Sequence, residues 1–307
     1  MKVIVIVGPT GVGKTRLSVE LAERFNGEII SGDSMQIYQQ MDIGTAKVTQ
    51  EEMKDVPHHL IDVKSPFDSY SVQEFQTTVR QKMEEITNRH HMPIIVGGTG
   101  LYIKAVLYDY VFEEADVDHQ SAQERFKDYS NEALYDYLKN IDPASADALH
   151  PNNRRRVLRA IEIYEATGRT KSEAIEKQTH EMIYDAYIIG LTCERSLLHE
   201  RINQRVDTMM TQGLFDEVKS LINQGCTPDL QSMKAIGYRE WFDYFNGQSS
   251  VEEVLEKIKI HSRQYAKRQY TWFNHQMRVN WFDVHFDDFN NTVEAVSHEV
   301  AQWICNQ

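Results

Sequence analysis

A glycine-rich loop follows the first apolar run of the chain. Residues 3–7 are Val-Ile-Val-Ile-Val, and residues 8–15 match the pattern G-x-x-x-x-G-K-[ST]. A helix is expected over residues 16–25. In this order of strand, loop and helix, backbone N–H groups and the helix N-terminus face a phosphate, Lys14 adds a full positive charge, and Thr15 can hold Mg²⁺. The pattern predicts a phosphate or diphosphate site. Its residues are Gly8, Thr10, Gly11, Val12, Gly13, Lys14 and Thr15.

Composition limits the class of protein. A chain of 307 residues that is 41% hydrophobic can form one large domain, or a domain with an insertion. Cys193, Cys226 and Cys305 lie far apart without C-x-x-C spacing, so neither a disulfide framework nor a zinc site is expected. No apolar run is long enough to span a bilayer. We therefore expect a cytoplasmic protein with no membrane partner.

The distribution of charge matters more than the net charge of −13. Residues 257–278 carry six Lys and Arg and no Asp or Glu, and residues 154–159 carry four arginines. The acidic excess lies elsewhere, for example at residues 113–118 and 283–288. Two basic segments keep the chain compatible with a polyanionic partner.

The first third of the chain alternates strands with helices. Strands are expected at residues 28–31 and 93–96, with a helix at 72–89 between them. Ser71 and Glu74 have the spacing of a capping box at the start of that helix. The alternation predicts an α/β fold with a parallel sheet, flanked by helices, whose ligand site lies at the carboxyl ends of its strands.

Residues 113–183 differ from the rest, because they are charged and helical without strand-like runs. We predict a catalytic core from residues 1–112 and 184–307, with 113–183 as a helical insertion domain. Within the insertion, helices are expected at residues 131–140, 144–149 and 153–167. After it, a strand is expected at 187–191 and helices at 195–213, 214–223, 251–273 and 291–305.

Two polar residues follow expected strands. Asp33 could ligate Mg²⁺ or act as a general base, and it could equally cap a turn. Thr99 lies among Gly97, Gly98 and Gly100, a pattern that indicates either close approach of the backbone to a ligand or a tight turn between strand and helix.

Two other features have more than one interpretation. His58 and His59 lie side by side on an extended segment, so their side chains point opposite ways and favour structural or substrate-orienting roles over a shared metal. Arg205 could clamp a diphosphate or be a surface charge, and its spacing does not decide between them.

Both basic segments favour contacts with nucleic acid. Arg155 and Arg159 share one face of a helix, and four arginines in six residues favour phosphate contacts over an ordinary solvated face. Residues 262–273 interleave cations with aromatic rings, which suits a nucleic-acid strand. The alternative is an amphipathic helix with Trp272 and Phe273 in the core.

Seven motifs occur in a fixed order. They are GPTGVGKT at residues 8–15, DSMQIY at 33–38, PHHLID at 57–62, GGTGLY at 97–102, RAIE at 159–162, AIGY at 235–238 and RQYAKRQ at 263–269. The series closely resembles the bacterial tRNA dimethylallyltransferase (tRNA isopentenyltransferase) family over about residues 3–275. Residues 11 and 12 are Gly-Val where the family often has Ala-Ser, which are free positions of the motif. We expect no zinc finger like the C-terminal one of eukaryotic relatives, because this sequence has no cysteine pair to form it.

The resemblance implies a fold like that of P-loop NTPases and a specific reaction. The family transfers a dimethylallyl group from dimethylallyl diphosphate to N6 of adenosine 37 in the tRNA anticodon loop, with Mg²⁺ as cofactor, and releases diphosphate. The resemblance also implies partners: dimethylallyl diphosphate and the anticodon stem-loop of tRNA. We expect the protein to be a monomer.

The same resemblance assigns roles to residues. Asp33 would be the general base, Lys14, Arg205 and Mg²⁺ on Thr15 would stabilise the departing diphosphate, and Thr99 would contact the target nucleotide or help to place the diphosphate. The adenine would be flipped out of its stack into a channel. The expected tRNA-binding residues are Asp33, Ser34, Met35, Gln36, Thr99, Arg155, Arg156, Arg159, Lys234, Gly237, Arg239, Arg263, Lys267 and Arg268.

The same motifs are compatible with three other functions. A transferase that prenylates free adenine nucleotides would need neither the insertion nor the basic segments. A phosphate-loop kinase or NTPase would need a second apolar strand ending in a carboxylate, whereas the strand at 93–96 ends in Gly-Gly-Thr-Gly. A non-catalytic RNA-binding protein would not need Asp33, Lys14 and Thr15 together.

Overall fold

A computed structural model describes residues 1–110, 112, 124–176 and 181–306. The chain forms two compact units. The core unit comprises Met1–Leu107 and Met182–Gln307, and the insertion unit comprises Tyr108–Glu181. The predicted start of the insertion, residue 113, and the acidic run at 113–118 lie outside the described residues.

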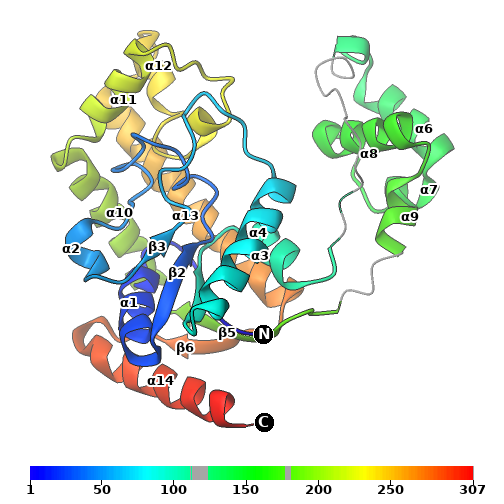
Figure 1. Cartoon of the computed structure of the whole chain (residues 1–307). Helices are drawn as coiled ribbons and strands as arrows, with labels where there is room; N and C mark the ends of the chain where they lie inside the picture. The colour runs from blue at the N-terminus through cyan, green and yellow to red at the C-terminus, as the bar shows by residue number, and fades with distance from the viewer. Residues whose placement is uncertain (111, 113–123, 177–180, 307) are drawn as a thin grey trace. The chain divides into compact units, whose positions relative to one another are not determined.

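The core unit contains a six-stranded sheet in the order β3-β2-β4-β1-β5-β6, with every pair parallel (Figure 1). The strands are β1 Lys2–Val7, β2 Gly27–Ser31, β3 His58–His59, β4 Met92–Val96, β5 Asp185–Thr192 and β6 Asn280–Asp283. The predicted α/β class with a parallel sheet is confirmed. β1 is central, and residues 3–7 are fully buried, because helices cover both faces of the sheet.

Nine α-helices of the core unit lie in the described part of the chain: α1 Lys14–Phe25, α2 Gln50–Met53, α3 Val72–Asn88, α4 Gly100–Leu107, α10 Arg195–Thr211, α11 Leu214–Asn223, α12 Trp241–Phe245, α13 Val251–Gln276 and α14 Phe289–Cys305. Ile4 and Ile6 point to one face of the sheet and pack with α1 and α14. The alternate residues, Val3 and Val5, face the other side, where α3 and α4 pack together.

Glycines bring the strand ends together at the carboxyl edge of the sheet. Gly32, after β2, donates its N–H to Val96 O of β4 at 2.7 Å, and Gly97 donates to Ile6 O of β1 at 3.1 Å. A Cβ on Gly97 would overlap the backbone of Gly32. The loops after β1, β2 and β4 therefore meet at one place.

Some local predictions are corrected by distant contacts. Ser71 caps α3 as predicted, accepting from Glu74 N at 3.0 Å. The Glu74 carboxylate does not return to the cap, because it pairs with Lys64 at 2.5 Å. The predicted capping box is therefore only half formed. Phe273 is buried in the core, whereas Trp272 is half-buried and packs against Gly100.

The insertion unit has its own apolar core. Its described helices include α6 Asn131–Ile141, α7 Pro143–Asp147, α8 Arg154–Thr167 and α9 Lys171–Glu176. Arg154 donates to Phe126 O and Tyr129 O at 2.6 Å each, so this arginine braces the unit. Asp142, which is 1% exposed, accepts from Ser145 N at 3.0 Å and from the Ser172 hydroxyl at 2.7 Å.

None of the described helices is both long enough and apolar enough to cross a membrane.

We predict that Asp142→Asn will destabilise the insertion unit by about 1–3 kcal/mol at pH 7. Burial alone would raise the pKa of Asp142, but hydrogen bonds from Ser145 and Ser172 outweigh it and lower the pKa. A lowered carboxyl pKa stabilises the fold above the unfolded pKa of about 3.9, and this contribution is lost as the pH falls. Hydrogen exchange of residues 130–172 in the intact chain measures the effect.

The matched control is Asp147→Asn, since Asp147 lies on the same helix and is exposed. Equal exchange in the two variants at pH 7, or a difference that grows toward pH 3, would contradict the prediction.

Candidate active site

The phosphate loop leaves its N–H groups available for an anion. Gly8, Gly11 and Gly13 have φ values of 138°, 88° and 93°, in the region that favours glycine. A Cβ on Gly8 would also lie 2.6 Å from Leu191 O. Gly13 is the N-cap of α1 and has no side chain to cap the helix, so the first N–H groups of α1 remain for a ligand.

Lys14 places a half-buried ammonium group in this loop. Its Nζ donates to Gly8 O at 3.0 Å and to Pro9 O at 2.8 Å. Desolvation, the charge of Arg205 and the opposing charge of Asp33 together lower the pKa of Lys14 to about 8, and desolvation contributes most. A bound anion would favour the charged form of Lys14, so the geometry suits a phosphate.

Helix α10 brings two arginines to the loop. Arg205 is half-buried; desolvation lowers its pKa and the charge of Asp33 opposes the shift, so Arg205 lies close enough to Asp33 to interact with it. Arg201, one turn earlier, donates from Nε to Gly11 O at 3.2 Å, and its guanidinium lies 3.7 Å from the Phe286 ring centroid. The sequence analysis missed Arg201, although its i,i+4 spacing from Arg205 was a usable signal.

Asp33 and Thr99 come together from the loops after β2 and β4. Asp33 Oδ1 accepts from Met35 N at 2.8 Å, so one oxygen does cap the turn, as the simpler interpretation holds. The second oxygen remains available to a substrate or ion. Thr99 Oγ1 accepts from Ser34 N at 3.3 Å and lies 3.4 Å from Ser34 Oγ. The two alternatives for Asp33 are therefore compatible.

The buried face of α13 ties two loops together. Gln269 is 5% exposed, accepts from Thr10 N at 3.1 Å and donates to Gly98 O at 3.0 Å. Burial raises the pKa of Tyr265 to about 12, with a further contribution from the Asp33 charge. Gln269 was not among the predicted site residues, because its partners lie more than 150 residues away in the sequence.

The exposed face of α13 carries the cations. A groove of about 620 Å³ lies along it, lined by Gln264, Lys267, Arg268, Thr271, Trp272, His275 and Gln276. Lys267 and Arg268 are exposed there. The cations and aromatic rings of residues 262–273 thus lie on two faces of α13. The buried face contacts the two loops, and the exposed face carries Lys267 and Arg268 beside the indole ring of Trp272.

His58 and His59 form β3 at the edge of the sheet. His59 Nε2 lies 2.6 Å from Glu28 Oε2, and Arg89 donates to the same oxygen at 2.7 Å. His58 Nδ1 lies 2.8 Å from Val56 O. These contacts favour the structural role, and no group of His, Cys, Asp and Glu suited to a metal occurs within the described residues.

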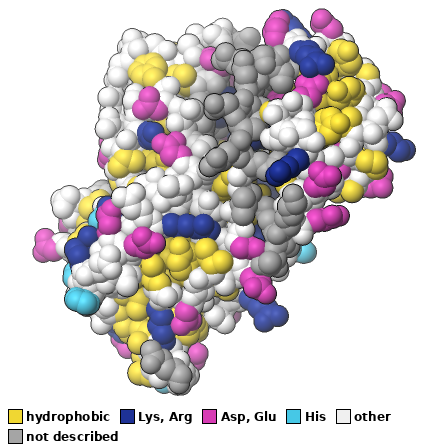
Figure 2. Space-filling view, turned by 45° about the vertical axis from the view of Figure 1, so that its right-hand side comes forward, with side chains coloured by type: hydrophobic (Ala, Val, Ile, Leu, Met, Phe, Trp, Pro, Cys, Tyr) yellow, Lys and Arg dark blue, Asp and Glu magenta, His cyan; other side chains and the backbone are white. Residues whose placement is uncertain are grey.

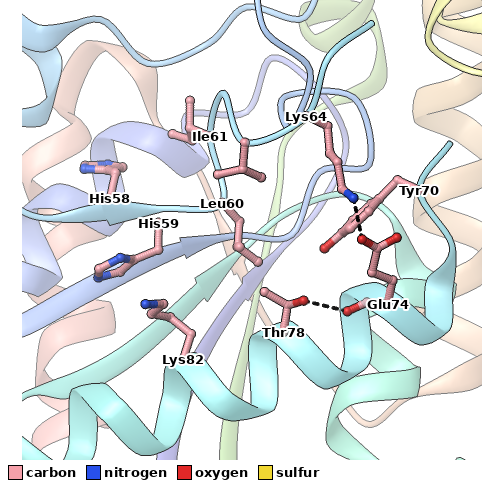
Figure 3. A pocket seen from close by; sticks show the side chains of 10 residues that line it. His58, His59, Leu60, Ile61, Lys64, Tyr70, Glu74, Thr78 and Lys82 are labelled. Carbon is pink, nitrogen blue, oxygen red and sulfur yellow. Dashed lines mark hydrogen bonds and ion pairs between the residues drawn. The ribbon is translucent and has the colours of Figure 1, made fainter. Parts of the chain in front are cut away.

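Beside β3 lies a cavity of about 470 Å³, which is lined on one side by residues of the β3 segment and on the other by α3 (Figure 3). Of the residues that line it, Lys64 pairs with Glu74 of α3 at 2.5 Å.

The other predicted tRNA-binding residues differ in accessibility. Lys234 and Arg239 are exposed, but Gly237 is buried with φ 97°, and its N–H donates to Glu240 Oε2 at 2.9 Å. Arg263 is half-buried and donates to Asn203 Oδ1.

In the insertion unit, Arg155 and Arg156 are exposed, and Arg159 lies 3.5 Å from Glu162. On the face shown in Figure 2, Lys and Arg side chains are interspersed with Asp and Glu.

This arrangement defines a phosphate-loop α/β protein. Backbone N–H groups, Lys14 and Arg205 can hold a phosphorylated group, and the Asp33 carboxylate lies beside them. Such a site can place an anionic leaving group next to a proton acceptor.

Comparison with known proteins identifies the family. The model described as IPP transferase matches residues 36–276. A tRNA dimethylallyltransferase from Anoxybacillus flavithermus is 52% identical over 303 residues, 97% of this chain and 96% of that one. One from Bacillus licheniformis is 56% identical over 92% of this chain and 90% of its own.

Solved structures agree. The tRNA isopentenylpyrophosphate transferase from Bacillus halodurans has 47% identity and a TM-score of 0.74, covering 98% of this chain and 96% of its own. A eukaryotic dimethylallyltransferase acting on tRNA has 31% identity and a TM-score of 0.85, covering 96% and 77%. The chain belongs to the IPP transferase family, which confirms the resemblance and makes the chain a prenyltransferase.

We predict that the affinity for inorganic diphosphate will fall as the pH rises above about 8, because Lys14 loses its charge there. The ratio of dissociation constants between Lys14→Met and wild type, measured by calorimetry from about pH 6.5 to about pH 9.5, roughly 1.5 units on either side of the Lys14 pKa, isolates Lys14 from the titration of the ligand. This ratio is expected to be largest below pH 8 and to approach one at the alkaline end.

Lys54→Met is the control, since Lys54 is half-exposed and pairs with Glu20 and Glu23 at 3.0 Å. A ratio for Lys14→Met that does not change with pH would contradict a charged Lys14 in the anion site.

Proposed function

We propose that the protein transfers a dimethylallyl group from dimethylallyl diphosphate to N6 of adenosine 37 in the tRNA anticodon loop. The observation that carries the proposal is that three half-buried charged side chains, Lys14, Arg205 and Asp33, lie close enough to interact at the carboxyl edge of the sheet. Membership of the IPP transferase family and the tRNA named for its relatives support the choice of donor and acceptor.

The chemistry follows from the positions of the charges. The N6 lone pair of adenine is delocalised into the ring, so N6 attacks efficiently only if its proton is removed. Asp33 accepts that proton through the oxygen that does not cap the turn. The new C–N bond forms as the C–O bond to diphosphate breaks. Lys14, Arg205 and the N–H groups of the loop stabilise the negative charge that builds on the diphosphate oxygens.

The residues also suit Mg²⁺. Mg²⁺ in such sites usually keeps several waters and binds a hydroxyl or carboxylate together with substrate phosphate oxygens. Thr15, half-buried at the start of α1, would provide a hydroxyl ligand of this kind without a dedicated protein cage. When bound, the ion would neutralise charge on the leaving diphosphate.

Recognition of the acceptor requires an unstacked base. An adenine within a stacked loop cannot reach Asp33, so the base has to be flipped into a channel that Ser34, Met35, Gln36 and Thr99 line. Cations would hold the phosphates of the stem-loop: the exposed Arg155, Arg156 and Arg159 in the insertion unit, and in the core the exposed Lys234, Arg239, Lys267 and Arg268 together with the half-buried Arg263. Gly237, which is buried, would act through the backbone it shapes. We propose that the protein acts as a monomer.

The function is tested with Mg²⁺, dimethylallyl diphosphate and a stem-loop that contains an unpaired adenosine at position 37. Mass spectrometry should show one added dimethylallyl unit on that adenosine. Label on free AMP would instead support a nucleotide prenyltransferase, ATP hydrolysis a kinase or NTPase, and RNA retention without product a binding protein.

We predict that Asp33→Asn will lower the transfer rate by about 10²- to 10⁴-fold, the usual contribution of a positioned general base. Inorganic diphosphate should still bind within a few-fold of wild type, since Lys14 and the loop N–H groups are unchanged. Single-turnover kinetics and calorimetry separate the two effects. A variant that keeps the full transfer rate would exclude Asp33 as the base.

We also predict that Lys267→Ala will weaken RNA binding regardless of the stem sequence and reduce the salt dependence of binding by about one charge. Lys257→Ala is the control, because Lys257 lies on the same helix and pairs with Asp243 at 2.7 Å. Filter binding at several salt concentrations measures both slopes. Equal slopes for the two variants would remove Lys267 from the phosphate contacts.

A further inference from the structure

Glu217 binds the backbone of the loop at residues 42–44, and neither Glu217 nor this loop is among the predicted site residues. It lies in the first turn of α11. Its Oε2 accepts from Asp42 N at 2.9 Å and from Ile43 N at 2.8 Å. Its Oε1 accepts from Gly44 N at 3.1 Å and from the Tyr238 hydroxyl at 2.6 Å. Four donors on one carboxylate use most of its acceptor positions, and charge strengthens each bond.

The same loop holds the residue next to the proposed acceptor pocket. Gln36 Nε2 donates to Thr45 O and Ala46 O at 3.3 Å each, and Gln36 Oε1 accepts from Ser31 Oγ at 3.1 Å. Gln36 is three residues after Asp33. The position of residues 42–46 therefore determines where the segment 33–36 lies.

Two further contacts fix the loop. The Lys47 side chain is 5% exposed, and its Nζ donates to Tyr38 O at 2.5 Å and to Asp42 Oδ1 at 2.6 Å. It also pairs with Asp62 at 2.5 Å. On the other side, the Tyr238 ring packs so closely on Gly44 that any Cβ there would overlap it. This explains part of the AIGY motif at 235–238 without an RNA contact.

Glu217 is linked through its helices to the cation on the diphosphate side. Arg205 lies on α10 and Glu217 on α11, and Gly213, with φ 104°, forms the junction between the two helices. Glu217 N donates to Gly213 O at 3.0 Å. One pair of consecutive helices thus contacts both the anion site and the loop that carries the acceptor pocket.

We propose that Glu217 is a positioning residue that sets the segment 33–36 relative to Arg205. The inference rests on the proposed transfer reaction. Glu217 touches no reacting atom. Its carboxylate fixes residues 42–44, these fix Gln36, and Gln36 fixes the pocket into which the adenine enters. A shift of about 1 Å in a reacting group can lower a rate by about 100-fold.

The test is Glu217→Gln, which keeps the size of the side chain but replaces one acceptor oxygen by an NH₂ group facing backbone donors. We expect kcat/KM for the stem-loop to fall by about 10- to 100-fold, with the dissociation constant of diphosphate within twofold of wild type. A merely destabilised protein would lose both. Asp216→Asn is the matched control, because Asp216 is exposed in the same helical turn and the substitution removes the same charge.

A second variant and a second readout keep the test decisive. Tyr238→Phe keeps the ring on Gly44 and removes one donor to Glu217, so its effect should be smaller and non-additive with that of Glu217→Gln. Hydrogen exchange at residues 42–44 should be faster in Glu217→Gln and unchanged in Asp216→Asn.

If wild type transfers no dimethylallyl group, the proposed function fails. If wild type is active and Glu217→Gln matches Asp216→Asn in both kinetics and exchange, the positioning role is wrong. A parallel loss of diphosphate binding would also overturn it.

Discussion

The site depends on the half-buried positive charge of Lys14, for which the described part of the chain provides no salt bridge. The Lys14 ammonium is held by two backbone carbonyls, and among the groups that shift its pKa, Arg205 adds repulsion and only Asp33 adds attraction. Such an excess of partly desolvated positive charge is costly until an anion binds. A bound diphosphate would give an anionic partner to the N–H groups of the glycine loop, to the uncapped start of α1 and to the arginines of α10. The same excess favours departure of a group that leaves as an anion.

Helix α13 combines two tasks that are usually separate. Its buried face carries Gln269, which bonds the loop after β1 to the loop after β4, while its exposed face carries Lys267 and Arg268. A contact with RNA phosphates on the outer face, as proposed above, would therefore act on a helix that already contacts Thr10 and Gly98. In the proposed reaction, one helix would support both acceptor binding and placement of the diphosphate.

Sequence reasoning succeeded where the signal was local. The phosphate loop, the cap at Ser71, the strands β1, β2, β4 and β5 and most helices follow from motifs and periodicity within short windows. It failed where the role of a residue depends on a partner that is far away in the sequence. β3 has two residues and β6 four, too short for a periodic pattern. Glu74 has the spacing of a capping box but pairs with Lys64. Gln269 and Glu217 look like ordinary helix residues until the loops they bind are placed beside them.

The net charge of −13 overstates how strongly the surface of the protein would repel RNA. Several carboxylates are buried and fully engaged: Glu28 is 3% exposed and bonded to Arg89 and His59, and Glu240 is 4% exposed and bonded to Gly237 N and His261. Glu217 accepts four donors of the protein. These negative charges organise backbone and basic side chains inside the fold. Lys267 and Arg268, in contrast, lie at the surface, where a polyanion can contact them. The local electrostatic field, and not the net charge of the chain, therefore governs which partner can approach.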